Sequence, residues 1–305
     1  MSQTSSSKLS LGIAITLIAY LFFSAASSLV WNFQGKFPTI QIIFIQNVVA
    51  FFTILPISLR RGWRYMKTKN LHLHLLRDLF GLVSYFLFFL AIRFLNLVDA
   101  TTLNYTSPFF VPFVWWIWMK EKFDSQIWWL IIVGFIGVAL ILNPTKEIFD
   151  LGFVFGIFAG ITSAIALVSI RILNVHQEPM SRTLFYFFAV STLLSFPFAW
   201  ASWVPPMGSE WVLCALIGSA TALGQIALTI AYRYGTASYL SPLGYSVVIY
   251  NGLISYYLFD MPLSWRSFLG ALLIVVSGTI TYVWKRKAHT VKETFQTPQK
   301  EKPPM

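Results

Sequence analysis

Residues 11–31, LGIAITLIAYLFFSAASSLVW, and residues 151–173, LGFVFGIFAGITSAIALVSIRIL, decide the fold. Each is an apolar run long enough to cross a bilayer, which takes about 20 residues in a helix. Both runs begin with Leu-Gly at an offset of 140 residues, and Pro56 recurs as Pro197 at an offset of 141. The chain is therefore predicted to contain two copies of one membrane unit.

The composition places most of the chain in a membrane. Its 305 residues are 57% hydrophobic and 11% charged, with a mean hydropathy of +0.68, whereas soluble domains are about 45–50% apolar and about 25% charged. The apolar runs do not alternate with polar residues as barrel strands do. We therefore predict an all-α integral membrane protein with ten transmembrane helices, at residues 9–31, 39–59, 75–95, 100–119, 127–142, 151–173, 183–203, 211–232, 236–259 and 265–284.

The two copies are predicted to be inverted relative to each other. Five helices per copy is an odd number, so the second copy enters the membrane upside down. Because the first apolar run has a counterpart in the second copy, we expect a retained helix and not a cleaved signal peptide. The predicted parts are a cytoplasmic N-terminal segment (1–8), a first five-helix repeat (9–143), a second five-helix repeat (144–284) and a basic cytoplasmic tail (285–305).

The basic residues predict the orientation, because cytoplasmic loops retain Lys and Arg. With the N-terminus inside, 18 of the 22 basic residues fall on the inner side. Connection 60–70 carries five of them, whereas its counterpart at 201–210 carries none. The net charge of +11 thus indicates topology and not nucleic-acid binding. Both termini are expected in the cytoplasm, and the expected location is a bacterial inner membrane.

The end of each copy carries similar elements in the same order. In the first copy these are Ala91, Arg93, Asp99, Ala100, Pro108, the turn at 119–121 and segment 134–137; in the second they are 231–235, Ala237, Ser241, Pro242, 258–260 and 270–278. This order resembles the drug/metabolite transporter superfamily, specifically its ten-helix EamA-type members with two EamA repeats. The resemblance covers residues 9–284 and implies a carrier whose first, third, fourth, sixth, eighth and ninth helices line a central cavity. The chain departs from the family pattern at Asp260, where the family usually has Glu.

Polar and aromatic side chains follow one face of five of those six helices. Lipid cannot satisfy amides or phenols, so these faces should turn toward other helices or a wet cavity. Interhelical packing is the alternative role for such residues. The predicted substrate-binding residues are Tyr20, Ser24, Ser84, Tyr85, Asn104, Tyr105, Gln225 and Tyr245. In the sixth helix, small residues every four positions predict close packing instead: Gly152, Gly156, Gly160 and Ala164.

Charged residues are expected only near the helix ends. Since proton-driven carriers usually keep a titratable group within the membrane, this distribution favours a facilitator or an exchanger. Two Arg–Asp pairs at helix ends are candidate gates, and snorkelling of the arginines to the headgroups is the alternative. The candidate gate residues are Arg93, Asp99, Arg233 and Asp260.

The remaining residues argue against an enzyme. The single cysteine, Cys214, has no partner for a disulfide, and the four histidines lie outside the predicted spans, so no metal or cofactor site is expected. The polar and aromatic stripes suit transport of a small amphipathic or zwitterionic organic molecule. The resemblance implies metabolites such as amino acids or their derivatives, and also S-adenosylmethionine-like compounds. A multidrug or toxic-metabolite exporter and a non-transporting receptor or structural protein are the alternatives. The expected partners are a small-molecule substrate and the lipid bilayer, and a monomer suffices.

Engineered cysteines test the inverted threading. In a Cys214→Ala background, Lys67→Cys and Pro205→Cys should react with a membrane-impermeant maleimide from opposite faces, because their connections are equivalent in copies of opposite orientation. Permeabilised cells, in which both should react, provide the control. Labelling of both positions from one face would contradict the inverted arrangement.

Overall fold

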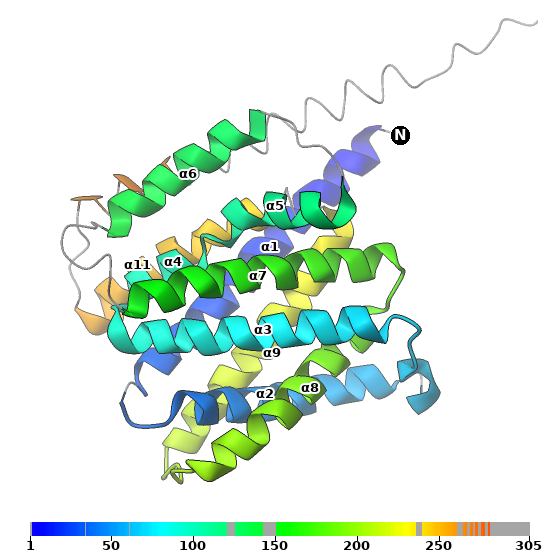
Figure 1. Ribbon diagram of the computed structural model, residues 1–305, viewed down its shortest axis with the longest axis vertical. Helices are drawn as coiled ribbons and strands as arrows, with labels where there is room; N and C mark the ends of the chain where they lie inside the picture. The colour runs from blue at the N-terminus through cyan, green and yellow to red at the C-terminus, as the bar shows by residue number, and fades with distance from the viewer. Residues whose placement is uncertain are drawn as a thin grey trace, which may run out of the picture.

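The computed structural model describes residues 2–33, 35–60, 62–120, 126–142, 151–235, 240–260 and nine positions between 265 and 280. This part of the chain is helical, without strands. Its elements are α1 (Ser2–Trp31), α2 (Thr39–Leu59), η1 (Trp63–Met66), α3 (Leu71–Phe94), α4 (Leu97–Asn104), α5 (Ser107–Met119), α6 (Gln126–Leu142), α7 (Leu151–Val175), α8 (Met180–Ala201), α9 (Glu210–Tyr234), η2 (Ser241–Tyr245) and α11 (Ser246–Phe259) (Figure 1).

Six of the described helices are long and apolar enough to cross a membrane. They are residues Ser10–Trp31 of α1 together with α2, α3, α7, α8 and α9. Each corresponds to a span predicted from hydropathy, although α1 reaches back to Ser2 and α3 begins at Leu71, four residues before the expected start. Most of the predicted span 265–284 and the whole tail 285–305 lie outside the described residues.

Two predicted spans are broken, which corrects the sequence prediction. The run expected as one helix at 100–119 forms α4 and α5, which are separated by Tyr105 and Thr106. The cause is Pro108: proline has no N–H to donate and disfavours a helical residue before it, but it fits the first turn of a new helix. The run expected at 236–259 is likewise divided, with Pro242 in η2 before α11. Because apolar residues continue through both breaks, hydropathy did not reveal them.

Each long helix of the first half packs against a long helix of the second half. By the sequence offset, α7 corresponds to α1, α8 to α2 and α9 to α3. In the structure α1 packs on α9, α3 packs on α7 and α2 packs on α8. The first two pairs are equivalent to each other, and the third joins two equivalent helices. Figure 1 shows α1 and α7 running in opposite directions.

The predicted close packing along α7 is present. A Cβ added to Gly156 would lie 2.5 Å from the Cβ of Leu103, and one added to Gly152 would lie 2.7 Å from the Cβ of Phe94. No side chain fits at such separations, so α7 approaches the end of α3 and the short α4 through its glycine face. The pair α1 and α9 also approaches closely at Gly12, where an added Cβ would lie 2.9 Å from the Cβ of Tyr234.

Substitution of a contact glycine tests this packing. Gly156→Ala should lower the midpoint of thermal unfolding in detergent by about 2–12 °C, since overpacking destabilises by about 1–3 kcal/mol and each kcal/mol shifts the midpoint by about 2–4 °C in a protein of 150–250 residues. Gly134→Ala is the matched control, because its added Cβ would have its nearest neighbours at 3.4 Å. An equal effect of both substitutions would contradict close packing at Gly156.

Candidate functional site

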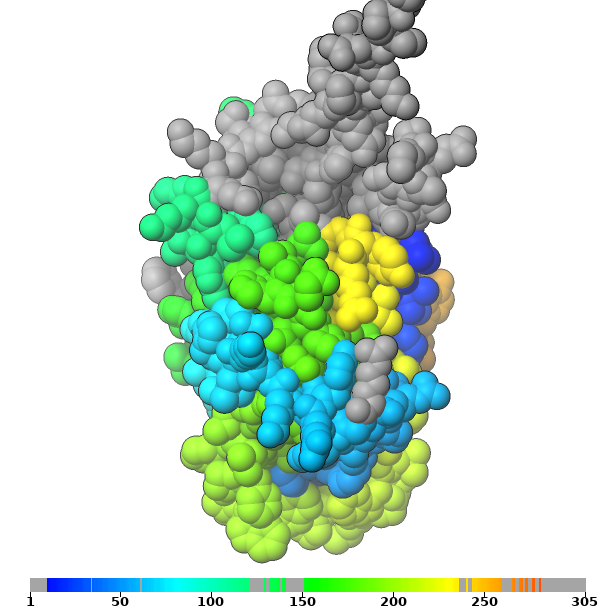
Figure 2. Space-filling view, turned by 90° about the vertical axis from the view of Figure 1, so that its right-hand side faces the viewer, coloured from blue at the N-terminus to red at the C-terminus, as the bar shows by residue number. Residues whose placement is uncertain are grey.

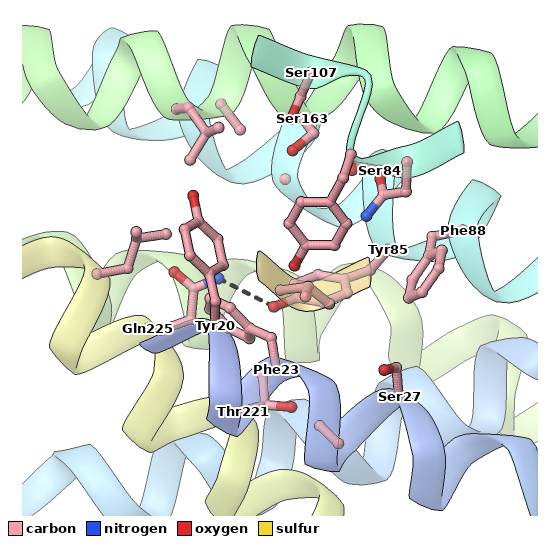
Figure 3. A pocket seen from close by; sticks show the side chains of 18 of the residues that line it. Tyr20, Phe23, Ser27, Ser84, Tyr85, Phe88, Ser107, Ser163, Thr221 and Gln225 are labelled. Carbon is pink, nitrogen blue, oxygen red and sulfur yellow. Dashed lines mark hydrogen bonds between the residues drawn. The ribbon is translucent and has the colours of Figure 1, made fainter. Parts of the chain in front are cut away.

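A cavity of about 90 Å³ lies in the centre of the helices and is lined by both halves of the chain (Figure 3). This volume holds several water molecules. Six of the eight predicted binding residues line the cavity: Tyr20, Ser84, Tyr85, Asn104, Tyr105 and Gln225. They come from α1, α3, the end of α4, the break between α4 and α5, and α9. The structure brings them together, and substrate binding by them stays a prediction.

Aromatic rings form the walls of the cavity. Tyr20 and Tyr105 meet edge to face with ring centroids 5.7 Å apart, and Tyr85 lies 6.3 Å from Phe187 of α8. The amide nitrogen of Gln225 donates to the Tyr85 hydroxyl at 3.1 Å, which fixes both polar groups in the wall (Figure 3). Aromatic faces with a few fixed polar groups are typical of pockets for small organic molecules.

The other two predicted residues, Ser24 and Tyr245, do not line this cavity. The Ser24 hydroxyl donates to the side-chain oxygen of Asn251, whose amide nitrogen donates to Thr101 at 2.7 Å. This buried cluster joins α1, α4 and α11, as the packing alternative for such residues implies. Tyr245 is also buried and packs beside Tyr105.

Arg77 is a lining residue that the sequence prediction missed. Arg77 and Asp78 lie near the start of α3, as expected for charged residues, but they are 1% and 0% exposed and not at the membrane surface. The reason is the early start of α3, which places both residues in its second turn. Asn70 precedes this start, and Asn is a common residue at helix N-termini. That signal indicated the longer helix.

The guanidinium of Arg77 is held on two sides. Its Nη2 donates to Oε1 of Gln225 at 2.9 Å, and its Cζ lies 3.5 Å from the centroid of the Phe187 ring. Nη1 is 3.6 Å from Oδ1 of Asp78. A permanent positive charge therefore lies at the cavity wall, next to the Gln225–Tyr85 hydrogen bond.

Further helices contribute lining residues that were not predicted, among them α7 and α2. Ser163 comes from α7, so this helix presents its glycines to α4 and another face to the cavity. Gln46 comes from α2 and is 1% exposed, and neither atom of its amide has a hydrogen-bond partner. The resemblance implied that the sixth predicted helix, which is α7, lines the cavity, but it did not include α2.

The candidate gate residues lie away from the cavity. Arg93 is exposed and donates to the backbone oxygen of Phe37, and the Asp99 carboxylate accepts from the Asn96 amide at 2.6 Å. Arg233 and Asp260 are exposed at the ends of α9 and α11. Gating by these four residues stays a prediction.

The profile of the EamA-like transporter family matches residues 10–143 and 150–283. The chain belongs to this family. The match covers each half of the chain once, in agreement with the duplication found in the sequence. The chain is therefore a membrane transporter of small molecules, and the family consists of transporters and not of enzymes.

Several EamA-type relatives carry functional names. The chain is 27% identical over 268 residues to a pseudopaline exporter of Pseudomonas aeruginosa (strain UCBPP-PA14), covering 87% of this chain and 94% of that protein. It is 28% identical over 259 residues to a riboflavin transporter of Vibrio cholerae (84% and 87% covered) and 25% identical over 271 residues to an S-adenosylmethionine uptake transporter of Rickettsia felis (87% and 90% covered). A crystal structure that is 17% identical has the same fold, with a TM-score of 0.73 over 93% of this chain and 99% of that one.

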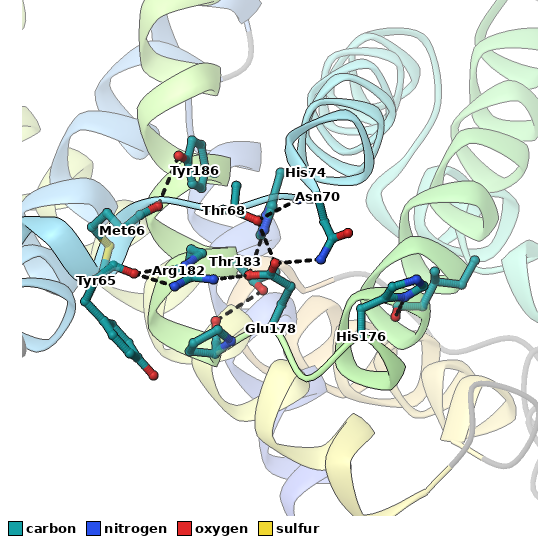
Figure 4. A network of polar contacts seen from close by, with 12 residues as sticks. Tyr65, Met66, Thr68, Asn70, His74, His176, Glu178, Arg182, Thr183 and Tyr186 are labelled. Carbon is teal, nitrogen blue, oxygen red and sulfur yellow. Dashed lines mark hydrogen bonds and ion pairs between the residues drawn. The ribbon is translucent and has the colours of Figure 1, made fainter.

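Polar contacts join the two halves of the transporter at one end of the bundle. We call this the α2–α3/α7–α8 joint, formed by residues 65–70, 74 and 178–186 (Figure 4). Arg182 donates from Nε and Nη2 to the backbone oxygen of Tyr65, at 3.0 and 2.5 Å. Figure 2 shows the light-blue α2–α3 connection against the green end of α7.

Glu178 is the centre of this joint. Its carboxylate accepts hydrogen bonds from Thr68 (2.6 Å), Asn70 (2.9 Å) and Arg182 (2.7 Å), and Nε2 of His74 lies 3.4 Å away. Desolvation favours the neutral acid, but these donors and the charge of Arg182 together outweigh it and lower the pKa of Glu178 to about 2. The carboxylate is therefore ionised at neutral pH.

An equivalent joint closes the opposite end. We call it the α1–α2/α8–α9 joint, formed by Lys36, Gln41, Val204 and Glu210. The Gln41 amide donates to the backbone oxygen of Val204 at 2.5 Å and accepts from its nitrogen at 2.8 Å. Lys36 forms an ion pair with Glu210. Gln41 and Arg182 correspond by the sequence offset, so both halves use the start of the same helix to hold a backbone carbonyl of the other.

Acid should weaken the α2–α3/α7–α8 joint through Glu178. A depressed pKa stabilises the fold above the unfolded value of 4.5, and this contribution is lost as the pH falls toward the folded value of about 2. The contribution of Glu178 to the midpoint of thermal unfolding in detergent should therefore be constant between pH 7 and 5. Below pH 4.5 this contribution should decrease, and the midpoint should fall. Glu178→Gln should flatten this dependence, and identical pH profiles of variant and wild type would contradict the assignment.

Proposed function

We propose that this transporter is a ten-helix carrier of two inverted five-helix repeats that moves small organic metabolites by alternating access. The observation that carries this proposal is one cavity lined by both halves between two equivalent joints. In an inverted-repeat carrier the two halves rock around a central site and open it to each side in turn. Separation of one joint while the other stays closed would expose the cavity to one side.

Amino acids or their derivatives, including S-adenosylmethionine-like compounds, are the proposed substrates. The tyrosines and amides in the cavity wall suit amphipathic molecules with hydrogen-bonding groups, and aromatic faces also attract cationic groups. The relatives' names cover three different compounds and include both an exporter and an uptake transporter. Substrate and direction therefore vary on this fold, and the lining residues of each chain determine them.

The proposed location is a bacterial inner membrane with both termini in the cytoplasm. In this orientation the α2–α3/α7–α8 joint is the inner closure and the α1–α2/α8–α9 joint is the outer one. Connection 60–70, with its five basic residues, belongs to the inner joint. A monomer contains the whole cavity and both closures, so it suffices for transport. Arg93 with Asp99 and Arg233 with Asp260 are proposed as additional gates at the helix ends.

Cross-linking of each joint tests alternating access. In a Cys214→Ala background, the pairs Gln41→Cys/Val204→Cys and Tyr65→Cys/Arg182→Cys place one cysteine on each half of the transporter. After reconstitution in proteoliposomes, uptake of labelled amino acids and S-adenosylmethionine should fall to background when either pair is joined by a short bismaleimide. The reason is that the inward-open state needs one joint open and the outward-open state needs the other, so a cross-link at either joint stops the cycle.

The four single-cysteine variants treated with the same reagent are the controls, and they should keep their untreated rates. Unchanged uptake with both joints cross-linked would contradict rocking of the halves. Absence of uptake of the whole panel by uncross-linked protein would contradict the proposed substrates.

A further inference from the structure

We propose that Arg77 recognises the substrate and that the substrate carries a carboxylate. This inference rests on the proposed carrier function and assigns a chemical class to its cavity. Arg77 is the one charged side chain among the described residues that line the cavity. A charged group placed at a cavity wall selects for the opposite charge in whatever enters.

The hydrogen-bonding capacity of Arg77 is largely unused. A guanidinium has five N–H donors and stays charged at any physiological pH. Of its three nitrogens only Nη2 has a hydrogen-bond partner, namely Gln225, whereas Nε and Nη1 have none. A buried donor without a partner is destabilising, and more so when it is charged. Both nitrogens are enclosed in the structure, and a substrate carboxylate that enters the cavity is the proposed acceptor for them.

Asp78 compensates only part of this charge. Its Oδ1 is 3.6 Å from Nη1 of Arg77, beyond hydrogen-bond distance, and Asp78 does not line the cavity. The fully buried carboxylate reduces the local positive charge and would repel a dianion. A substrate group with a single negative charge is repelled less by Asp78 than a dianion is, which favours a carboxylate over a phosphate monoester.

The neighbours of Arg77 fix its orientation. Phe187 lies against the guanidinium plane and Gln225 holds its Nη2 end, while Tyr85 in turn holds Gln225. Such a preorganised group loses little side-chain entropy when it binds. Since Gln225 occupies Nη2, the carboxylate is directed to the Nε and Nη1 donors, and the rest of the molecule lies against the Tyr20 and Tyr105 rings.

A structural role for Arg77 would leave ligand selectivity unchanged. In that case the residue only connects α3 to α9 through Gln225, and its replacement changes stability without favouring any ligand class. Ligands that differ only in charge separate the two roles.

Matched pairs of ligands provide the test. Binding of the twenty amino acids and of their primary carboxamides to the purified full-length protein is measured by thermal shift, and uptake is measured in proteoliposomes. At least one amino acid should stabilise the wild type, and its carboxamide should bind at least about tenfold more weakly, since a hydrogen bond to a charged group contributes on this scale. Arg77→Gln should weaken binding of the amino acid by a similar factor and leave binding of its carboxamide unchanged.

Additional variants keep the test decisive if Arg77→Gln is unstable. The double variant Arg77→Gln/Asp78→Asn leaves no buried charge unpaired, and Arg77→Lys keeps the charge without the planar group. Arg77→Lys should retain part of the preference, and the exposed control Arg64→Gln should retain all of it. The proposal would be overturned if no amino acid stabilised the wild type, or if only carboxamides did. It would also be overturned if amino acids and carboxamides stabilised the wild type equally and stabilised the double variant equally. If the wild type still took up uncharged compounds, the carrier function would be supported even though the role of Arg77 was overturned.

Discussion

The bilayer offers no hydrogen bonds, and the structure depends on this constraint. A polar side chain on a membrane helix must find its partner within the protein or face water. The transporter meets this requirement in two ways. The amide of Asn251 donates to hydroxyl groups of α1 and α4 in a buried cluster. The groups around Gln225 face a cavity instead. The same polar stripes thus produce both the contacts between helices and the site that they surround.

The sequence predicted the six long spans because hydropathy measures the property that a bilayer selects. It also predicted the close approach of α7, since glycines every four residues leave one face without side chains. Six of eight predicted residues meet at the cavity because helical spacing fixes which residues share a face. Spacing does not specify which neighbour that face meets, and for this reason Ser24 turned out to lie in the Asn251 cluster.

The features that the sequence did not reveal are local departures from a regular helix. The apolar pattern continues through the break at Tyr105 and Thr106, so only Pro108 indicated it. Arg77 was assigned to the edge of a span because charge was expected to mark the end of a helix. In the structure the helix continues past the charge, and partners on α8 and α9 make its burial tolerable. Such partners come from positions more than one hundred residues away, which no local pattern encodes.

Each joint combines a few polar contacts with an aromatic pair, Trp63 with Phe185 at one end and Phe44 with Trp203 at the other. A carrier must populate two states of similar free energy, because a substrate shifts their balance only by its difference in affinity for them. A large apolar contact at one end would hold the protein in a single state. Arg182 at one joint and Gln41 at the other each hold one backbone carbonyl of the other half. In the proposed cycle, equivalent contacts at the two ends therefore favour two states of similar free energy.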